Sequence, residues 1–199
     1  MIYVVSGPSG SGKSSLIGLA LTALRGARFS VSHTTRKKRT GEVEGRDYFF
    51  VSPDKFQKMA KGGRFVEWAV VHGAYYGTSK RELKKGENRD LILDIDVQGA
   101  RQVKEKIKNA VFIFVLPPSF GALKKRLRGR RTDSVEETGK RLAVARKEVR
   151  DYSRFAHLLI NDDLADAAAE LASIVRCHRS LLAARRAEIR PILKSFGKG

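Results

Sequence analysis

Eight residues near the start of the chain match a pattern that binds phosphate. Residues 7–14 read GPSGSGKS, which has the spacing G-x-x-x-x-G-K-S. Glycines let successive backbone N–H groups converge on one anion, and the N-terminus of a following helix adds partial positive charge. Lys13 can reach β- and γ-phosphate oxygens, and the Ser14 hydroxyl can bind Mg²⁺. The segment therefore predicts a triphosphate site made by Gly7, Pro8, Ser9, Gly10, Ser11, Gly12, Lys13, Ser14 and Ser15.

The flanking residues support this interpretation over a chance match in a Gly/Ser-rich turn. Residues 2–5 form a short apolar, β-branched run, which is typical of a strand buried on both faces. Residues 16–24 place apolar side chains at mostly helical spacing. The pattern thus lies between a predicted strand and a predicted helix, as a phosphate-binding loop requires.

A polar, basic stretch after the first helix is a candidate second phosphate site. Arg36 and Arg39 lie three residues apart, and paired guanidinium groups suit a phosphate dianion. Glu42 adds an acceptor to this group of donors. A solvated surface loop is the alternative.

Glu67 interrupts the apolar run of residues 65–71, which reads as a strand. If this carboxylate is buried, its charge requires hydrogen-bond donors. Guanine supplies two of them side by side, N1–H and N2–H₂. An edge-strand glutamate that faces water explains the run equally well. Residues 75–78, Tyr-Tyr-Gly-Thr, are expected to form a tight turn that adds two phenols and a hydroxyl.

Asp94 and Asp96 follow the apolar residues 91–93. Ligand chemistry in α/β sheets collects at the carboxyl ends of strands. Either aspartate could therefore help to hold Mg²⁺ or a substrate, through water or directly.

A basic helical segment follows the predicted strand at residues 111–116. The helix that begins after Ser119 ends in the run KKRLRGRR at residues 124–131, and the next helix carries Arg141. Two solvated helices would account for this pattern. The functional alternative is a mobile lid whose arginines close over the triphosphate.

Composition limits the class of protein. The 199 residues carry a net charge of +19, and residues 124–150 and 176–199 contribute +7 and +6 of it. Such a field attracts polyanions, either nucleotides or nucleic acid, so nucleic-acid contact by the basic tail is an open alternative. The single cysteine excludes an intrachain disulfide framework, and the four histidines lack metal-ligand spacing. The chain starts with a core strand and has no apolar run of about 18 residues, so we expect a cytoplasmic protein with no membrane partner.

Alternating strands and helices predict an α/β fold with a parallel sheet flanked by helices. A β-rich stretch at residues 32–79 breaks this rhythm and is interpreted as an inserted substrate module. The core then comprises residues 1–31, 80–123 and 148–199, with a lid at residues 124–147 and a basic C-terminal helix or tail at the end.

Several motifs in one order resemble the guanylate kinases, P-loop nucleoside monophosphate kinases that transfer a phosphoryl group from ATP to GMP. They are GPSGSGKS, SVSHTTRKKRTGEVEGRDYFFV, FVEWAVVHGAYYGTS, LILDIDVQGA, KKRLRGRR and INDD, within residues 1 to about 175. The chain departs from the family pattern at Lys37 and Lys38, where proline is frequent, and at Arg131, where glycine is frequent.

The resemblance implies a role for each matching position. Guanine recognition falls to Ser32, Glu67 and Thr78. The GMP phosphate falls to Arg36, Arg39, Tyr48 and Tyr76, with Glu42 close by. Asp96 lies near the guanine and the metal-bound phosphates, and Asn161 lies where the family approaches adenine. Lys13 and the lid residues Arg126, Arg130 and Arg141 would carry catalysis.

These observations predict the reaction MgATP + GMP → ADP + GDP, in purine nucleotide metabolism, with Mg²⁺ as cofactor. The residues do not separate GMP from dGMP, and they leave the oligomeric state open. Two other functions are alternatives: a binding module that has lost ATP chemistry, and a nucleic-acid-associated NTPase. The intact phosphate loop and lid arginines argue against the first, and the lack of a helicase-like motif argues against the second.

Overall fold

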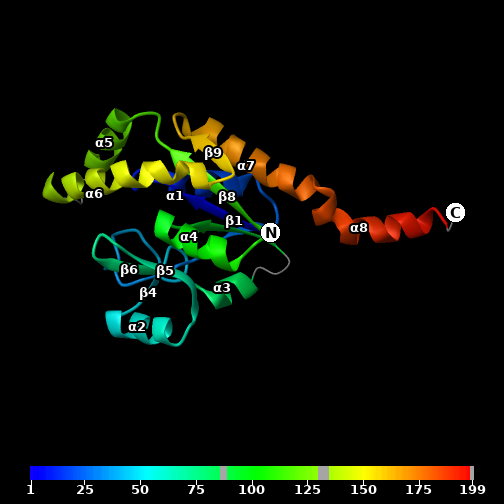
Figure 1. The fold of residues 1–199 in the computed structure, drawn as a ribbon, viewed down its shortest axis with the longest axis horizontal. Helices are drawn as coiled ribbons and strands as arrows, with labels where there is room; N and C mark the ends of the chain where they lie inside the picture. Colours follow the sequence, from blue (N-terminus) through cyan, green and yellow to red (C-terminus); the bar gives the residue numbers. More distant parts are fainter. Residues whose placement is uncertain (86–88, 130–134, 198–199) are drawn as a thin grey trace.

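The core of the protein is a five-stranded sheet. The computed structural model describes residues 1–85, 89–129 and 135–197. In this part of the chain the strand order is β2-β7-β1-β8-β9, and every pairing is parallel. The strands are β1 (Ile2–Ser6), β2 (Ala27–Phe29), β7 (Asp90–Asp94), β8 (Ala110–Leu116) and β9 (His157–Ile160). The predicted parallel α/β fold is confirmed (Figure 1).

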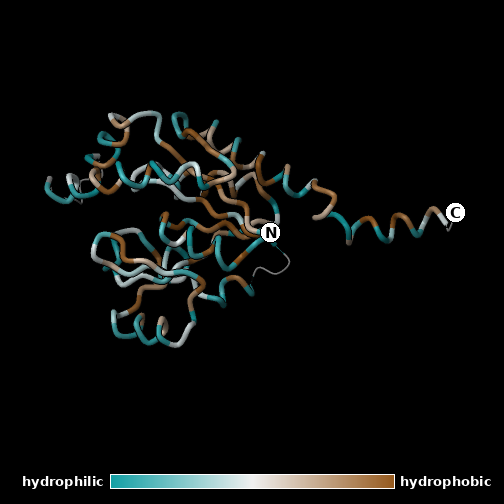
Figure 2. Tube along the Cα trace, viewed as in Figure 1, coloured by the Kyte–Doolittle hydropathy of each residue, from teal (hydrophilic) through white to brown (hydrophobic). Residues whose placement is uncertain are grey.

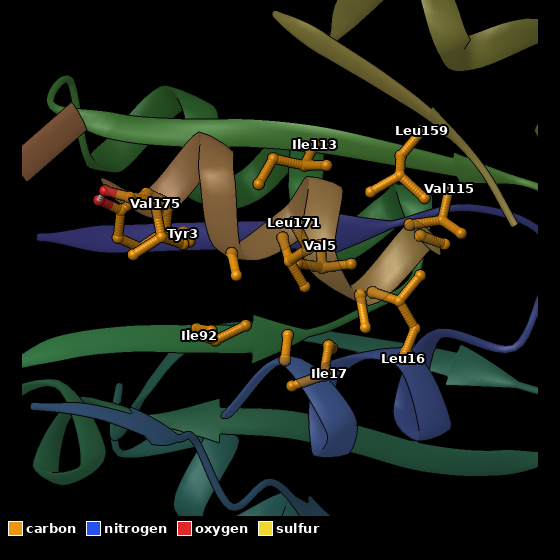
Figure 3. Packing of buried hydrophobic residues seen from close by; sticks show 14 of the residues in the cluster. Tyr3, Val5, Leu16, Ile17, Ile92, Ile113, Val115, Leu159, Leu171 and Val175 are labelled. Carbon is orange, nitrogen blue, oxygen red and sulfur yellow. Dashed lines mark hydrogen bonds between the residues drawn. The ribbon is translucent and has the colours of Figure 1, made fainter. Parts of the chain in front are cut away.

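Helices cover both faces of this sheet, because alternate residues of the central strands point to opposite sides. Tyr3 and Val5 pack on one side with α1 (Lys13–Thr22) and α7 (Leu164–Ser180), as Figure 3 shows. Val4 packs on the other side with α4 (Val97–Lys106). The middle residues of the central strands are accordingly apolar (Figure 2), which is the pattern of a sheet buried on both faces.

Residues 33–79 form a second sheet, of order β4-β3-β6-β5. Its elements are β3 (His33–Thr34), β4 (Phe49–Phe50), α2 (Pro53–Lys61), β5 (Phe65–Val71) and β6 (Ala74–Ser79). Ser52 caps α2 by accepting the Lys55 N–H at 3.2 Å, with Pro53 at the first helical position. Phe56 stacks on Phe65 and Tyr75 and gives this sheet a small core of its own.

The expected turn at residues 75–78 is wrong. These residues lie inside β6, and the chain reverses earlier, at His72 and Gly73. Both residues have positive φ angles, 50° and 79°, which suits the two-residue turn of a hairpin. The aromatic and threonine side chains favour a strand, and this preference prevails over the turn tendency of a single glycine.

The remaining helices connect or extend the core. They are α3 (Lys80–Lys84), α5 (Phe120–Arg128), α6 (Val135–Glu148), the 3₁₀ turn η1 (Val149–Arg154) and α8 (Leu182–Ser195). Helix α8 extends away from the body of the protein, and none of its residues is buried (Figure 1). Among the described residues, no helix combines the length and apolar character needed to cross a membrane.

Candidate active site

The phosphate loop connects β1 to α1 through backbone conformations that favour glycine. Gly7, Gly10 and Gly12 have φ angles of 141°, 91° and 90°. A side chain on Gly7 would also collide with the backbone oxygen of Val115 in β8. The Lys13 ammonium donates to the backbone oxygens of Gly7 at 2.7 Å and Pro8 at 3.2 Å. The loop therefore curls around its own lysine at the carboxyl end of the sheet.

Two polar side chains, from Asn161 and Arg126, bond to the backbone of this loop. The Asn161 amide donates to the Ser11 backbone oxygen at 2.7 Å, and it is buried. Arg126 of α5 donates to the Ser11 oxygen at 3.3 Å and to the Asn161 oxygen at 2.8 Å. A side chain on Gly12 would collide with the Asn161 amide. The loop is thus tied to both α5 and the end of β9.

A hydroxyl and a carboxylate, both possible oxygen ligands of a metal ion, meet where β7 ends. The Ser14 hydroxyl donates to Oδ2 of Asp94 at 2.7 Å, beside Lys13. Asp96 instead caps α4, where Oδ1 accepts the Gly99 N–H at 2.9 Å and Oδ2 accepts from Gln98 at 3.0 Å. The hydroxyl and carboxylate oxygens suit Mg²⁺, which takes few protein ligands and keeps several waters. In the described part of the chain no three His, Cys, Asp or Glu side chains cluster as metal ligands would.

Helix α6 contacts the loop through two residues on one face. Arg141 donates to the Ser9 hydroxyl at 2.8 Å, and Glu148 accepts the Ser9 N–H at 3.2 Å. Burial raises the pKa of Glu148, while the charge of Lys13 acts in the opposite direction. Glu148 was not predicted. Its position seven residues after Arg141, two helical turns along the same face, is the signal in the sequence that could have found it.

A cavity of about 1050 Å³ joins the phosphate loop to the second sheet and to α6. Its walls come from segments that are far apart in the chain. They include Gly7, Ser9, Gly10, Gly12, Lys13, Ser14 and Ser15 from the loop, Ser32, Arg36, Arg39, Glu42, Tyr48, Glu67 and Tyr76 from the second sheet and its loops, Asp94 and Asp96, and Glu137, Lys140 and Arg141. The walls combine cationic groups, which suit phosphates, with carboxylates, which accept hydrogen bonds.

Protein groups fix the orientation of Arg36 on one side of the cavity. Arg36 forms a two-point ion pair with Glu42, at 2.6 and 3.1 Å, and its Nε donates to the Tyr76 hydroxyl at 3.1 Å. The guanidinium lies 5.4 Å from the centre of the Tyr48 ring. Burial disfavours both charges, but the pairing outweighs it, so the pKa of Arg36 is raised and that of Glu42 is lowered. Arg36 is thus a permanent cation held in one orientation.

Glu67 is buried, with 3% of its surface exposed, although β5 is an edge strand of the second sheet. One carboxylate oxygen accepts the Thr78 N–H at 2.8 Å, and Thr78 in turn lies 3.4 Å from the Ser32 hydroxyl. Burial raises the pKa of Glu67 to about 7, and the hydrogen bonds from Thr78 oppose that rise. The alternative of a water-facing glutamate is wrong, because this side chain points to the cavity and to α4.

Most of the predicted site residues line this single cavity. Pro8, Ser11, Thr78, Arg126 and Asn161 do not line it. Thr78 bonds to Glu67, which does line it, while Arg126 and Asn161 bond to the backbone oxygen of Ser11 within the loop. Arg130 lies outside the described residues.

Comparison with known proteins identifies the family. The family model described as guanylate kinase matches residues 1–178. The chain is 45% identical to a guanylate kinase of Geobacter metallireducens over 90% of this chain and 89% of the relative. It is 46% identical to one of Escherichia coli K12, over 89% and 88% of the two chains. The crystal structure of guanylate kinase from Anaplasma phagocytophilum superimposes with a TM-score of 0.75 at 30% identity, covering 92% of this chain and 87% of that one. This chain therefore belongs to the guanylate kinase family.

Proposed function

We propose that the protein transfers the γ-phosphoryl group of ATP to GMP and releases ADP and GDP. The observation that carries this proposal is the cavity that joins a phosphate loop to a fixed arginine and a buried carboxylate. Residues 7–15 hold the donor, and the module of residues 32–79 holds the acceptor. We place the reaction in cytoplasmic purine nucleotide metabolism, because the substrates are purine nucleotides and the single cysteine suits a reducing compartment.

The chemistry needs no dedicated general base. A phosphate oxygen of GMP, already anionic near neutral pH, attacks the γ-phosphorus, and the bond from that phosphorus to the β–γ bridging oxygen breaks. Catalysis then consists of alignment and charge neutralisation. Lys13 and Arg141 supply positive charge on the donor side, and Arg36 and Arg39 hold the acceptor phosphate. Arg126 acts through the loop that it supports, and Arg130 remains a prediction from the resemblance.

Mg²⁺, when bound, would neutralise phosphate charge between the donor and acceptor. Ser14 and Asp94 are the residues placed to hold it, directly or through water, and Asp96 lies on the same side of the cavity. The lid at residues 124–147 contributes Arg141, and its closure would exclude water that could otherwise hydrolyse ATP.

The choice of GMP as the phosphoryl acceptor follows from Glu67. The ionised carboxylate accepts from guanine N1–H and N2–H₂, and Ser32 and Thr78 complete the polar wall. Adenine presents an acceptor at N1, so AMP would leave a buried carboxylate against a lone pair. Sites that bind through buried polar groups reject such partners strongly.

The test is a coupled assay of ADP release with MgATP and each of AMP, CMP, GMP and UMP. We expect turnover with GMP, and also with dGMP, since no described residue is dedicated to the ribose 2′-hydroxyl in this proposal. Equal rates with AMP and GMP would overturn it. A binding module without ATP chemistry would show no turnover at all.

A further inference from the structure

The strand that carries Glu67 has an open edge that faces α4. Strand β5 lies at the end of the second sheet, so β6 pairs with one of its edges only. Backbone N–H and C=O groups on the other edge need partners from elsewhere. The side chains of α4 supply them.

Gln102 pairs with both backbone polar groups of Trp68. The Trp68 N–H donates to Oε1 of Gln102 at 3.2 Å, and Nε2 of Gln102 donates to the Trp68 oxygen at 2.7 Å. The amide thus replaces one unit of a neighbouring strand. Because Trp68 needs one acceptor and one donor, this pairing also defines which way the amide group faces.

Lys106 and Gly99 complete the contact on either side of Gln102. The Lys106 ammonium donates to the Val66 oxygen at 2.5 Å. A side chain on Gly99 would collide with Oε2 of Glu67, so glycine allows the carboxylate to approach the helix. Gly99, Gln102 and Lys106 follow at spacings of three and four, on one face of α4. The backbone is therefore held at the residue before Glu67 and at the residue after it.

We propose that Gln102, supported by Lys106, is a positioning residue for recognition of GMP, the phosphoryl acceptor. It touches neither substrate. It holds β5 against the nucleotide-binding core and so places the Glu67 carboxylate where the base must bind. This inference rests on the proposed role of Glu67 in reading guanine. Its physical basis is that a displacement of about 1 Å in a recognition group is enough to lose much of its effect.

The test compares Gln102→Ala with Glu105→Ala, an exposed residue of the same helix. Both replacements keep a strong helix former on α4, so a change in helix propensity cannot separate them. In the coupled assay we expect Gln102→Ala to raise KM for GMP about tenfold, with KM for ATP changed less than twofold. Glu105→Ala should leave both values unchanged. Gln102→Glu keeps the acceptor for the Trp68 N–H but turns the donor into a second acceptor, so it should fold and still raise KM for GMP.

Trp68 is the only tryptophan of the chain and is partly exposed, which allows a readout without turnover. In Gln102→Ala, the backbone N–H of Trp68 should lose protection in hydrogen exchange. Acrylamide should also quench the fluorescence of the Trp68 indole ring more strongly. In Gln102→Glu, the amide should keep its protection.

Three results for Gln102→Ala would overturn the inference. They are an unchanged KM for GMP, equal increases in the KM values for GMP and ATP with a lowered Tm, or unchanged hydrogen exchange of the Trp68 backbone amide. The proposed function fails separately. If the wild-type protein does not phosphorylate GMP, that proposal falls, while the exchange of the Trp68 amide still reports whether Gln102 holds the strand.

Discussion

The two halves of the cavity are built in different ways. In the proposed function, the donor half is one continuous loop, residues 7–15, with Arg141 of α6 beside it. The acceptor half gathers side chains from separate strands and loops, with Ser32, Arg36, Glu67 and Tyr76 as its centre. A continuous loop depends mainly on its local conformation, which Asn161 and Arg126 support here. A dispersed pocket also needs its elements to be held against one another.

The charged side chains of the two halves of the cavity are also paired in different ways. In the acceptor half, Arg36 is matched by Glu42 and Tyr76, and Glu67 is matched by Thr78. In the donor half, Lys13 bonds to backbone oxygens of the loop that surrounds it. In the proposed function, the donor half therefore binds phosphate in general, while the acceptor half selects one base.

The largest expected effect is on the donor half. Lys13→Ala removes the cation that faces the transferring group, and we expect kcat to fall on the order of 10³-fold. The dissociation constant for GMP, measured by calorimetry, should stay within about twofold, since the acceptor half is untouched. A large loss of GMP affinity would contradict the independence of the two halves.

The second effect concerns the acceptor half. Glu67→Gln keeps an acceptor for the Thr78 N–H but places an amide against guanine donors. We expect kcat/KM for GMP to fall on the order of 10²-fold, with KM for ATP unchanged. Because the amide carries no charge to desolvate, the same variant should unfold at a higher urea concentration at pH 8 than the wild-type protein. A variant less stable than wild type would contradict the burial cost that we assign to Glu67.

The third effect depends on pH. In the proposed role, Glu67 binds guanine when ionised, and burial raises its pKa to about 7. KM for GMP should therefore rise about tenfold for each pH unit below 7. The free protein should behave in the opposite way, because a carboxyl with a raised pKa in the folded state favours folding when protonated. That stabilisation is complete below its ordinary value of 4.5 and is lost as the pH rises through 7. Steady-state kinetics and urea unfolding from pH 5.5 to 8.5 would test both trends, and Glu67→Gln should flatten both.

The smallest effect concerns the contact between α6 and the loop. Glu148→Ala removes the acceptor of the Ser9 N–H. One hydrogen bond of about 1 kcal/mol corresponds to a rise in KM for ATP of roughly fivefold. KM for GMP should not change, and Glu136→Ala, at an exposed position of α6, is the matched control. An equal change for both substrates would mean that α6 acts on the whole cavity rather than on the donor half.

Local patterns predicted much of this architecture. The phosphate loop lies between β1 and α1, and the apolar runs form the parallel strands. The mistaken turn at residues 75–78 shows the limit of local patterns, because a glycine within β6 resembled a turn signal. Asp96 shows the same limit, since the sequence could not distinguish a metal ligand from the cap of α4.

The sequence by itself determined the parallel core, the donor loop and the residue types that a second nucleotide requires. These depend on local conformation and on periodicities that short segments carry. Only the tertiary structure decided that Glu67 is buried, that Glu148 reaches Ser9 and that Gln102 holds the backbone of Trp68. Such contacts join residues 34 to 139 positions apart, and no spacing along the chain encodes which distant side chain completes an open strand edge or a loop N–H.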